Sequence, residues 1–136
     1  MSAELENFED HHAWTLSDHR VTQLCVEMTS CRLLSWSLQE SVEVRFASSF
    51  ELMLADGSTR RIDPSAQEQL APLLTLVGRS LLQLVVSRSG GLELRLSDGS
   101  VIEMRARATR PSFEVNGAGA LEGMTYVSGV ASGPLW

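Results

Sequence analysis

One nine-residue stretch occurs twice in this chain, and the repeat constrains the fold more than any other feature. Residues 50–58 read FELMLADGS, and residues 92–100, which lie 42 positions later, read LELRLSDGS. Six of the nine residues are identical. Alternating apolar residues that run into Asp-Gly are typical of a strand entering a tight turn. The sequence therefore predicts two copies of one β-hairpin.

The apolar pattern around the first Asp-Gly pair selects the length of its turn. A two-residue loop would pair Glu51 with Ile62 and so place an apolar residue on the polar face. A three-residue loop with Gly57 in the left-handed conformation pairs Glu51 with Arg61 and Phe50 with Ile62 instead. Because a slip of one residue turns every side chain to the other face, the pattern predicts the three-residue loop.

The second copy extends the repeat and also shows where it is broken. The same turn, with Gly99 left-handed, pairs Leu94 with Ile102, Leu92 with Met104 and Glu93 with Glu103. Upstream, the strand expected over 21–26 is echoed by 81–86, but at an offset of 60 residues. The first copy thus has 18 additional residues within 27–49, and their alternation predicts one or two added strands. This insertion and the tail beyond 111 are not duplicated, so we expect the function to lie there.

One helix is predicted between the copies, over residues 64–77. Asp63 supplies a cap, Pro64 suits the first turn, and a Ser-x-x-Glu capping box follows. Four apolar residues recur at helical spacing: Leu70, Leu73, Leu74 and Val77. Pro72 lies within this run and is expected to kink the helix, since proline has no backbone N–H.

These elements predict an α+β fold. We expect a mainly antiparallel sheet, or two packed sheets, built from two related β-hairpin modules with one kinked helix between them. Residues 1–17 are expected to be an acidic, mobile lead, and residues 18–136 a single domain. Within it we place a first module (20–63), the helix (64–77), a second module (80–107) and glycine-rich C-terminal strands (111–136). The expected core is Leu24, Val26, Val44, Phe46, Phe50, Leu52, Leu54, Leu70, Leu73, Leu74, Val77, Leu84, Val86, Leu92, Leu94, Leu96, Ile102 and Met104.

Charge and residue usage exclude several classes of function. The formal net charge is −6, and all eleven basic residues are arginine. Without lysine, Schiff-base chemistry and the P-loop are excluded. The acidity argues against general nucleic-acid binding, which requires cations that displace phosphate counterions. No apolar run is long enough to span a membrane, and the acidic N-terminus does not resemble a signal peptide, so we expect a cytoplasmic location.

No set of residues has the spacing of a catalytic or metal site. His11, His12 and His19 share no face of a strand or helix, so a solvated segment is expected there rather than a metal centre. Cys25 and Cys31 do not have a zinc spacing and are expected to be reduced structural residues. We therefore expect no catalytic residue, metal or cofactor, and the sequence leans against an enzyme.

The segment from about residue 21 to 136 resembles a family of small uncharacterised bacterial domains. The resemblance rests on turn and core motifs: Val21-Thr22-Gln23-Leu24, Asp56-Gly57, Leu70-Ala71-Pro72-Leu73-Leu74, Gly78, Asp98-Gly99 and Asn116-Gly117. It implies no catalytic residue. By size and acidity, the chain is more weakly similar to bacterial immunity proteins, which bind and block a toxin.

The leading functional hypothesis is a non-enzymatic protein-binding module of the immunity or antitoxin type. Four glutamates are expected to face outward and steer a basic partner, such as a basic toxin: Glu40, Glu43, Glu51 and Glu93. An arginine stripe, Arg105, Arg107 and Arg110, is a second candidate contact for an anionic group. The alternative is a small-molecule-binding domain or enzyme with a pocket between sheet and helix. A homodimer formed through strand edges is a third possibility.

Overall fold

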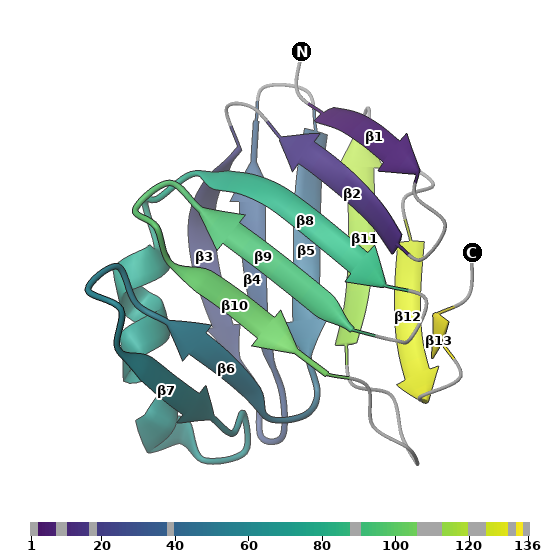
Figure 1. The fold of residues 1–136 in the computed structure, drawn as a ribbon. Coiled ribbons are helices and arrows are strands. Elements are labelled where there is room, and N and C mark those ends of the chain that lie inside the picture. Colours follow the sequence, from purple (N-terminus) through teal and green to yellow (C-terminus); the bar gives the residue numbers. More distant parts are fainter. Residues whose placement is uncertain are drawn as a thin grey trace.

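The described residues form a sandwich of two antiparallel sheets with one short helix, which is an α+β fold (Figure 1). Of the two expected arrangements, a single sheet or two packed sheets, the chain forms the two packed sheets. The computed structural model describes residues 3–7, 11–16, 19–37, 40–87, 91–105, 113–119, 125–130 and 133–134. Side chains are described for 13–16, 19–37, 40–87, 91–105 and 113–119.

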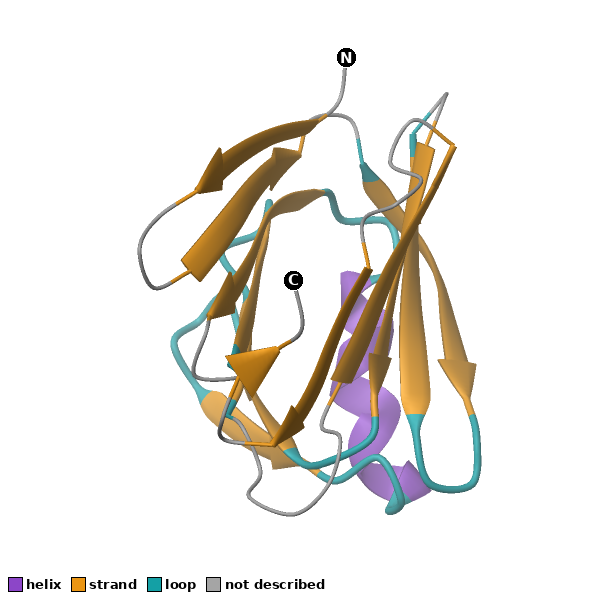
Figure 2. Ribbon diagram, turned by 90° about the vertical axis from the view of Figure 1, so that its right-hand side faces the viewer, coloured by secondary structure: helices purple, strands orange, loops and turns teal. Residues whose placement is uncertain are grey.

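Sheet A has seven strands and sheet B has six. In spatial order, sheet A contains β1 (Ala3–Asn7), β2 (His11–Leu16), β8 (Leu81–Ser87), β9 (Leu92–Leu96), β10 (Val101–Met104), β6 (Phe50–Met53) and β7 (Thr59–Ile62). Sheet B contains β13 (Gly133–Pro134), β12 (Thr125–Val130), β11 (Phe113–Gly119), β5 (Glu40–Phe46), β4 (Cys31–Trp36) and β3 (Arg20–Val26). The helix η1 (Gln67–Leu76) lies between the layers, on the side where β7 and β3 form the edges (Figure 2).

Both repeated hairpins have the predicted turn. Gly57 and Gly99 adopt φ values of 89° and 91°, the left-handed region that glycine enters without a steric penalty. Phe50 faces Ile62 across the first hairpin, and Leu92 faces Met104 across the second. The two hairpins also lie next to each other in sheet A, because β10 pairs with β6. The repeat therefore builds one continuous four-stranded block.

The insertion in the first copy forms two strands, β4 and β5, which lie in the middle of sheet B. This separates the two echoed strands: β3 forms an edge of sheet B, whereas β8 lies within sheet A. The chain returns to sheet A between β5 and β6, where the rings of Phe46 and Phe50 pack at 4.4 Å between centroids. The insertion thus supplies two of the six strands of sheet B.

The core fills the space between the sheets, and most of the predicted core residues are buried there. The helix shows where the prediction was wrong. Leu70, Leu73 and Leu76 are buried at intervals of three, whereas Leu74 and Val77 are 62% and 39% exposed. The reason is that η1 is a 3₁₀ helix, which has three residues per turn rather than the 3.6 of an α-helix.

Three other local expectations were also wrong. The capping box does not form, because the helix starts after Ala66 without a side-chain cap; Asp63 instead accepts hydrogen bonds from Ser65. Val26 is 47% exposed, since it ends an edge strand. Leu24 and Leu54 are half-buried, packed against the core.

The described part of the N-terminal lead forms two strands. Its residues 3–7 and 11–16 pair as β1 and β2, and β2 pairs with β8 to extend sheet A. Leu16 is buried and Trp14 packs against the core. Glu4 and Glu6 therefore belong to an edge strand of the sandwich.

Candidate protein-binding face of sheet A

Three glutamates stand side by side on the outer face of sheet A. Glu51 of β6 faces Glu103 of β10, and Glu103 faces Glu93 of β9. Arg61 of β7 and Val85 of β8 continue this transverse row on either side. Like charges directly opposite each other destabilise an antiparallel pair. The contacts within the glutamate row (Glu51, Glu103 and Glu93) are therefore unfavourable in themselves.

Arginines next to the row offset part of this repulsion. Arg95 Nε lies 2.7 Å from Glu93 Oε2, and Arg105 Nε lies 3.8 Å from Glu103 Oε1. The two arginine side chains are 57% and 91% exposed. Exposed pairs of this kind contribute only about 0–1 kcal/mol, because water screens them and the long side chains lose entropy. An incoming partner could therefore displace the arginines at little cost.

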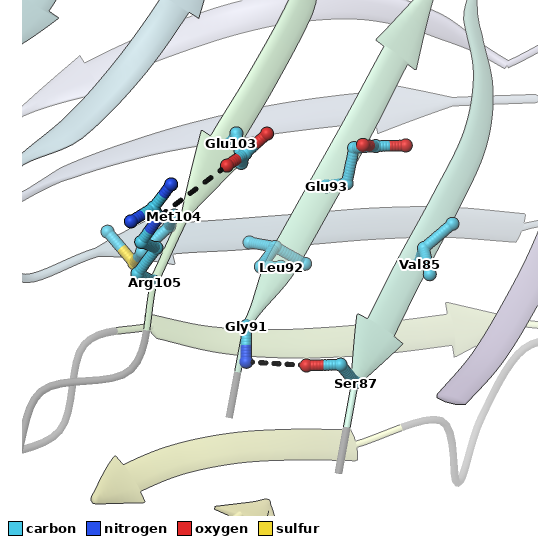
Figure 3. A pocket seen from close by; sticks show the side chains of 8 residues that line it. All are labelled: Val85, Ser87, Gly91, Leu92, Glu93, Glu103, Met104 and Arg105. Carbon is cyan, nitrogen blue, oxygen red and sulfur yellow. Dashed lines mark hydrogen bonds and ion pairs between the residues drawn. The ribbon is translucent and has the colours of Figure 1, made fainter. Parts of the chain in front are cut away.

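A hollow adjoins the row where β8 and β10 end and β9 begins (Figure 3). Its volume is about 480 Å³, and Val85, Glu93, Glu103 and Arg105 form part of its lining. Gly91, just ahead of β9, lines the hollow where the chain passes close to its neighbours. A Cβ at this position would lie 3.0 Å from Ser87 Oγ and 3.3 Å from the Met104 carbonyl oxygen. The glycine also donates its backbone N–H to Ser87 Oγ, so the hollow has a polar rim on the β8 side.

The structure separates the four glutamates that the sequence grouped together. Glu51 and Glu93 lie on the outer face of sheet A, as expected. Glu43 lies on the opposite outer face, in sheet B, where Arg32 Nη1 donates to it at 3.2 Å. The hydrogen bond to Glu43 and the negative charge of Glu43 raise the pKa of Arg32 above its ordinary value. The outward placement of Glu40 was wrong, because only 4% of this residue is exposed.

The arginine stripe is only partly within the described chain. Arg105 is exposed and lines the hollow beside Glu103. Arg107 and Arg110 lie outside the described residues.

The principal feature that the sequence did not predict is a buried pair between His19 and Glu40. His19 Nε2 lies 2.5 Å from Glu40 Oε1, and the two side chains are 0% and 1% exposed. The backbone carbonyl of His19 accepts from Leu81 N–H, so this residue joins sheet B to β8 of sheet A. His19 Nδ1 has no hydrogen-bond partner among the described residues. The partners are 21 residues apart and no local pattern links them, so no signal in the sequence could have identified the pair.

The cysteines and histidines form no evident reactive centre in the described part of the chain. Both cysteines are free thiols, and burial raises the pKa of Cys31 to about 12. The thiolate of Cys31 is thus strongly disfavoured, as suits a structural residue. Among the described residues, no group of histidine, cysteine, aspartate and glutamate is arranged to hold a metal ion. His11 and His12 lie on β2, but their side chains are outside the described set.

Comparisons with known proteins place the chain in a family but assign it no activity. None of the helices in the described chain is long and apolar enough to cross a membrane. The chain matches no curated protein and no solved structure. A family model covers residues 12–129, which is most of the chain and nearly the region of the resemblance noted above. The protein belongs to that family, a family of unknown function designated DUF6188.

Proposed function

We propose that this chain is a non-enzymatic protein-binding module of the immunity or antitoxin type, and that the outer face of sheet A binds and blocks a basic partner. The observation that carries the proposal is the glutamate row. Its three carboxylates occupy neighbouring strands at the spacing of directly opposed residues, about 4.5–5.5 Å between Cβ atoms. Like charges placed directly opposite each other are unfavourable for a sheet, and unfavourable arrangements of this kind are typical of sites that serve binding.

The chemistry of the face fits a partner that presents arginine or lysine. A cation that enters between Glu93 and Glu103 relieves their mutual repulsion and gains two charge-assisted contacts. Arg95 and Arg105, which flank these glutamates, then face acidic groups at the rim of the partner. Such a mixed pattern favours specificity and speeds association, and it weakens as salt rises. The hollow beside Gly91 provides room for one anchoring side chain.

The experiment compares the two outer faces of the sandwich. Tagged wild-type chain, the triple variant Glu51→Gln/Glu93→Gln/Glu103→Gln and the control Glu43→Gln/Glu114→Gln are used to capture proteins from the native host. The control removes carboxylates from sheet B only. We expect one basic protein to be captured by the wild type and the control and lost with the triple variant. The purified partner should then lose its own activity when mixed with the wild-type chain.

Two results would count against the proposal. One is a partner that the triple variant captures as well as the wild type does. The other is the absence of any captured protein at low salt, where charge-driven association is strongest.

The hollow supports a second candidate function, small-molecule binding. A volume of about 480 Å³ is within the range of ligand pockets. This hollow lies on the outer face and not between sheet and helix. The variant Val85→Trp places a large ring at the hollow, which Val85 lines. A small molecule that co-purifies with the wild type and is lost in this variant, with no protein captured, would favour the second candidate.

A further inference from the structure

The two edges of sheet A carry opposite charge. One edge is β1, whose five residues include Glu4 and Glu6. The other edge is β7, whose four residues include Arg60 and Arg61. Residues 59–61 are all exposed. Figure 1 shows these strands at opposite ends of the sheet, β1 beside the N-terminus and β7 beside the helix.

The net charge of the protein is concentrated in the segment that contains the β1 edge. The first 19 residues contain five of the seventeen carboxylates and none of the eleven arginines. The remainder therefore holds twelve carboxylates and eleven arginines and is close to neutral. The acidity of this chain is thus a property of its N-terminal segment, and it does not spread over the rest of the sequence.

Edge strands expose backbone N–H and C=O groups that can pair with another strand, and charged residues normally prevent this. Like charge at an edge disfavours pairing of that edge with its own copy. It weakens pairing of β1 with β1 and of β7 with β7, which are the two symmetric arrangements. Opposite charge favours the remaining arrangement, in which β1 of one molecule pairs with β7 of another.

The register of the sheet agrees with this arrangement. Glu6 faces Ala13, Ala13 faces Val85, and the row continues through the glutamate row to Arg61. Position 6 and position 61 are therefore the two ends of one transverse row. A second copy that continues the sheet brings the acidic end of one row next to the basic end of another.

We propose that the occupant of these edges is a second copy of this chain, joined head to tail through β1 of one molecule and β7 of the next. The contact is heterologous, so it closes into a ring or grows into a chain of molecules rather than stopping at a symmetric dimer. With edges of five and four residues, the backbone contributes few hydrogen bonds, so assembly depends on concentration and salt. This association does not use the outer face of sheet A and is independent of the function proposed above.

Sedimentation velocity over a concentration series tests the proposal with two charge-reversed variants. One is Glu4→Arg/Glu6→Arg, which makes both edges basic. The other is Arg60→Glu/Arg61→Glu, which makes both edges acidic. Each variant alone should associate about tenfold more weakly than the wild type or worse. An equimolar mixture of the two should associate again, because each basic edge then meets an acidic one.

The control Glu43→Gln/Glu114→Gln changes sheet B only and should leave self-association unchanged. Circular dichroism confirms that each variant is folded, and Arg60→Glu alone replaces the double variant if a second carboxylate opposite Glu51 proves too destabilising. A wild type that remains monomeric across the series overturns the proposal, as does association that the edge charges and their recombination do not alter. Neither result bears on capture of a basic partner by the outer face.

Discussion

Glutamate carboxylates lie both in the interior of the sandwich and on the outer face of sheet A, but their neighbours differ. Inside, His19 and Glu40 form one close polar pair with almost no exposure to water. Outside, Glu51, Glu103 and Glu93 stand side by side with their repulsion only partly offset. Burial makes a missing partner expensive, whereas water and mobile arginines make a badly matched neighbour tolerable. The difference separates the charges that are paired in the interior from those that remain exposed on the outer face.

The largest effect should come from breaking the buried pair. Glu40→Ala removes the carboxylate that His19 Nε2 contacts, in an interior where Nδ1 of the same ring already has no described partner. Removing one member of a buried pair costs about 3–5 kcal/mol. We expect a loss of that size in the free energy of unfolding, measured by urea denaturation.

A double-mutant cycle separates this coupling from the loss of packing. In Glu40→Leu/His19→Phe both polar groups are replaced by apolar ones, and the double variant should be more stable than the sum of the single changes predicts. Additive effects, each below about 1 kcal/mol, would show that the interior tolerates unpaired polar groups and would remove the contrast with the outer face.

Two leucines of η1 allow a buried side chain to be compared with an exposed one where neither carries a charge. Leu76 is fully buried and Leu74 is 62% exposed, although they are two residues apart on one helix. Leu76→Ala should cost about 2–5 kcal/mol, because it removes buried surface and leaves a cavity. Leu74→Ala should change the free energy of unfolding by less than about 0.5 kcal/mol. Equal costs would contradict the 3₁₀ pitch of this helix.

The leucines also show why part of the fold could not be read from the sequence. Local rules were sufficient for the hairpins, because turn type and pairing register are fixed by neighbouring residues around Gly57 and Gly99. The burial of the η1 leucines depends on contacts with elements far away in the chain, such as β3. A pattern of Leu70, Leu73, Leu74 and Val77 is compatible with an α-helix, and only packing selects Leu76 instead.

The candidate site divides in the same way. The opposition of Glu93 and Glu103 within one hairpin follows from its turn and was predicted. The third member, Glu51, joins the row because β6 pairs with β10, and that pairing connects two hairpins far apart in the chain. The His19–Glu40 pair likewise depends on how the chain crosses between sheets. Non-local strand pairing is therefore the step that a single sequence does not reveal.

The burial of Cys31 makes the stability of the fold depend on pH. The pKa of Cys31 is raised by burial from 9.0 to about 12, while Cys25 is half-buried. Between pH 9.0 and about pH 12, the Cys31 thiol ionises in the unfolded chain but stays protonated in the folded one. The Cys31 thiol therefore does not affect the free energy of unfolding below pH 9. As the pH rises further the free energy of unfolding falls, by about 2 kcal/mol near pH 10.5. Thermal melts of the wild type should show this loss, and Cys31→Ala should show a smaller one.

Thiol labelling provides an independent measurement. An alkylating reagent at neutral pH should modify Cys25 in the folded protein and reach Cys31 only as the protein unfolds. Equal labelling of both cysteines under native conditions would contradict the burial of Cys31.

The smallest expected effect is a gain in the free energy of unfolding, from the substitution Glu103→Gln. Glu103 is the middle member of the glutamate row, with Glu51 on one side and Glu93 on the other. Glu103→Gln removes two like-charge contacts and loses only a long, exposed pairing with Arg105. We expect the variant to be more stable than the wild type by about 0.3–1 kcal/mol and to bind the basic partner less tightly. Glu43→Gln is the matched control, since it weakens a hydrogen bond to Arg32 and should be slightly less stable. A Glu103→Gln variant that is destabilised would mean that the row contributes to the fold, and the argument that it is kept for binding would fail.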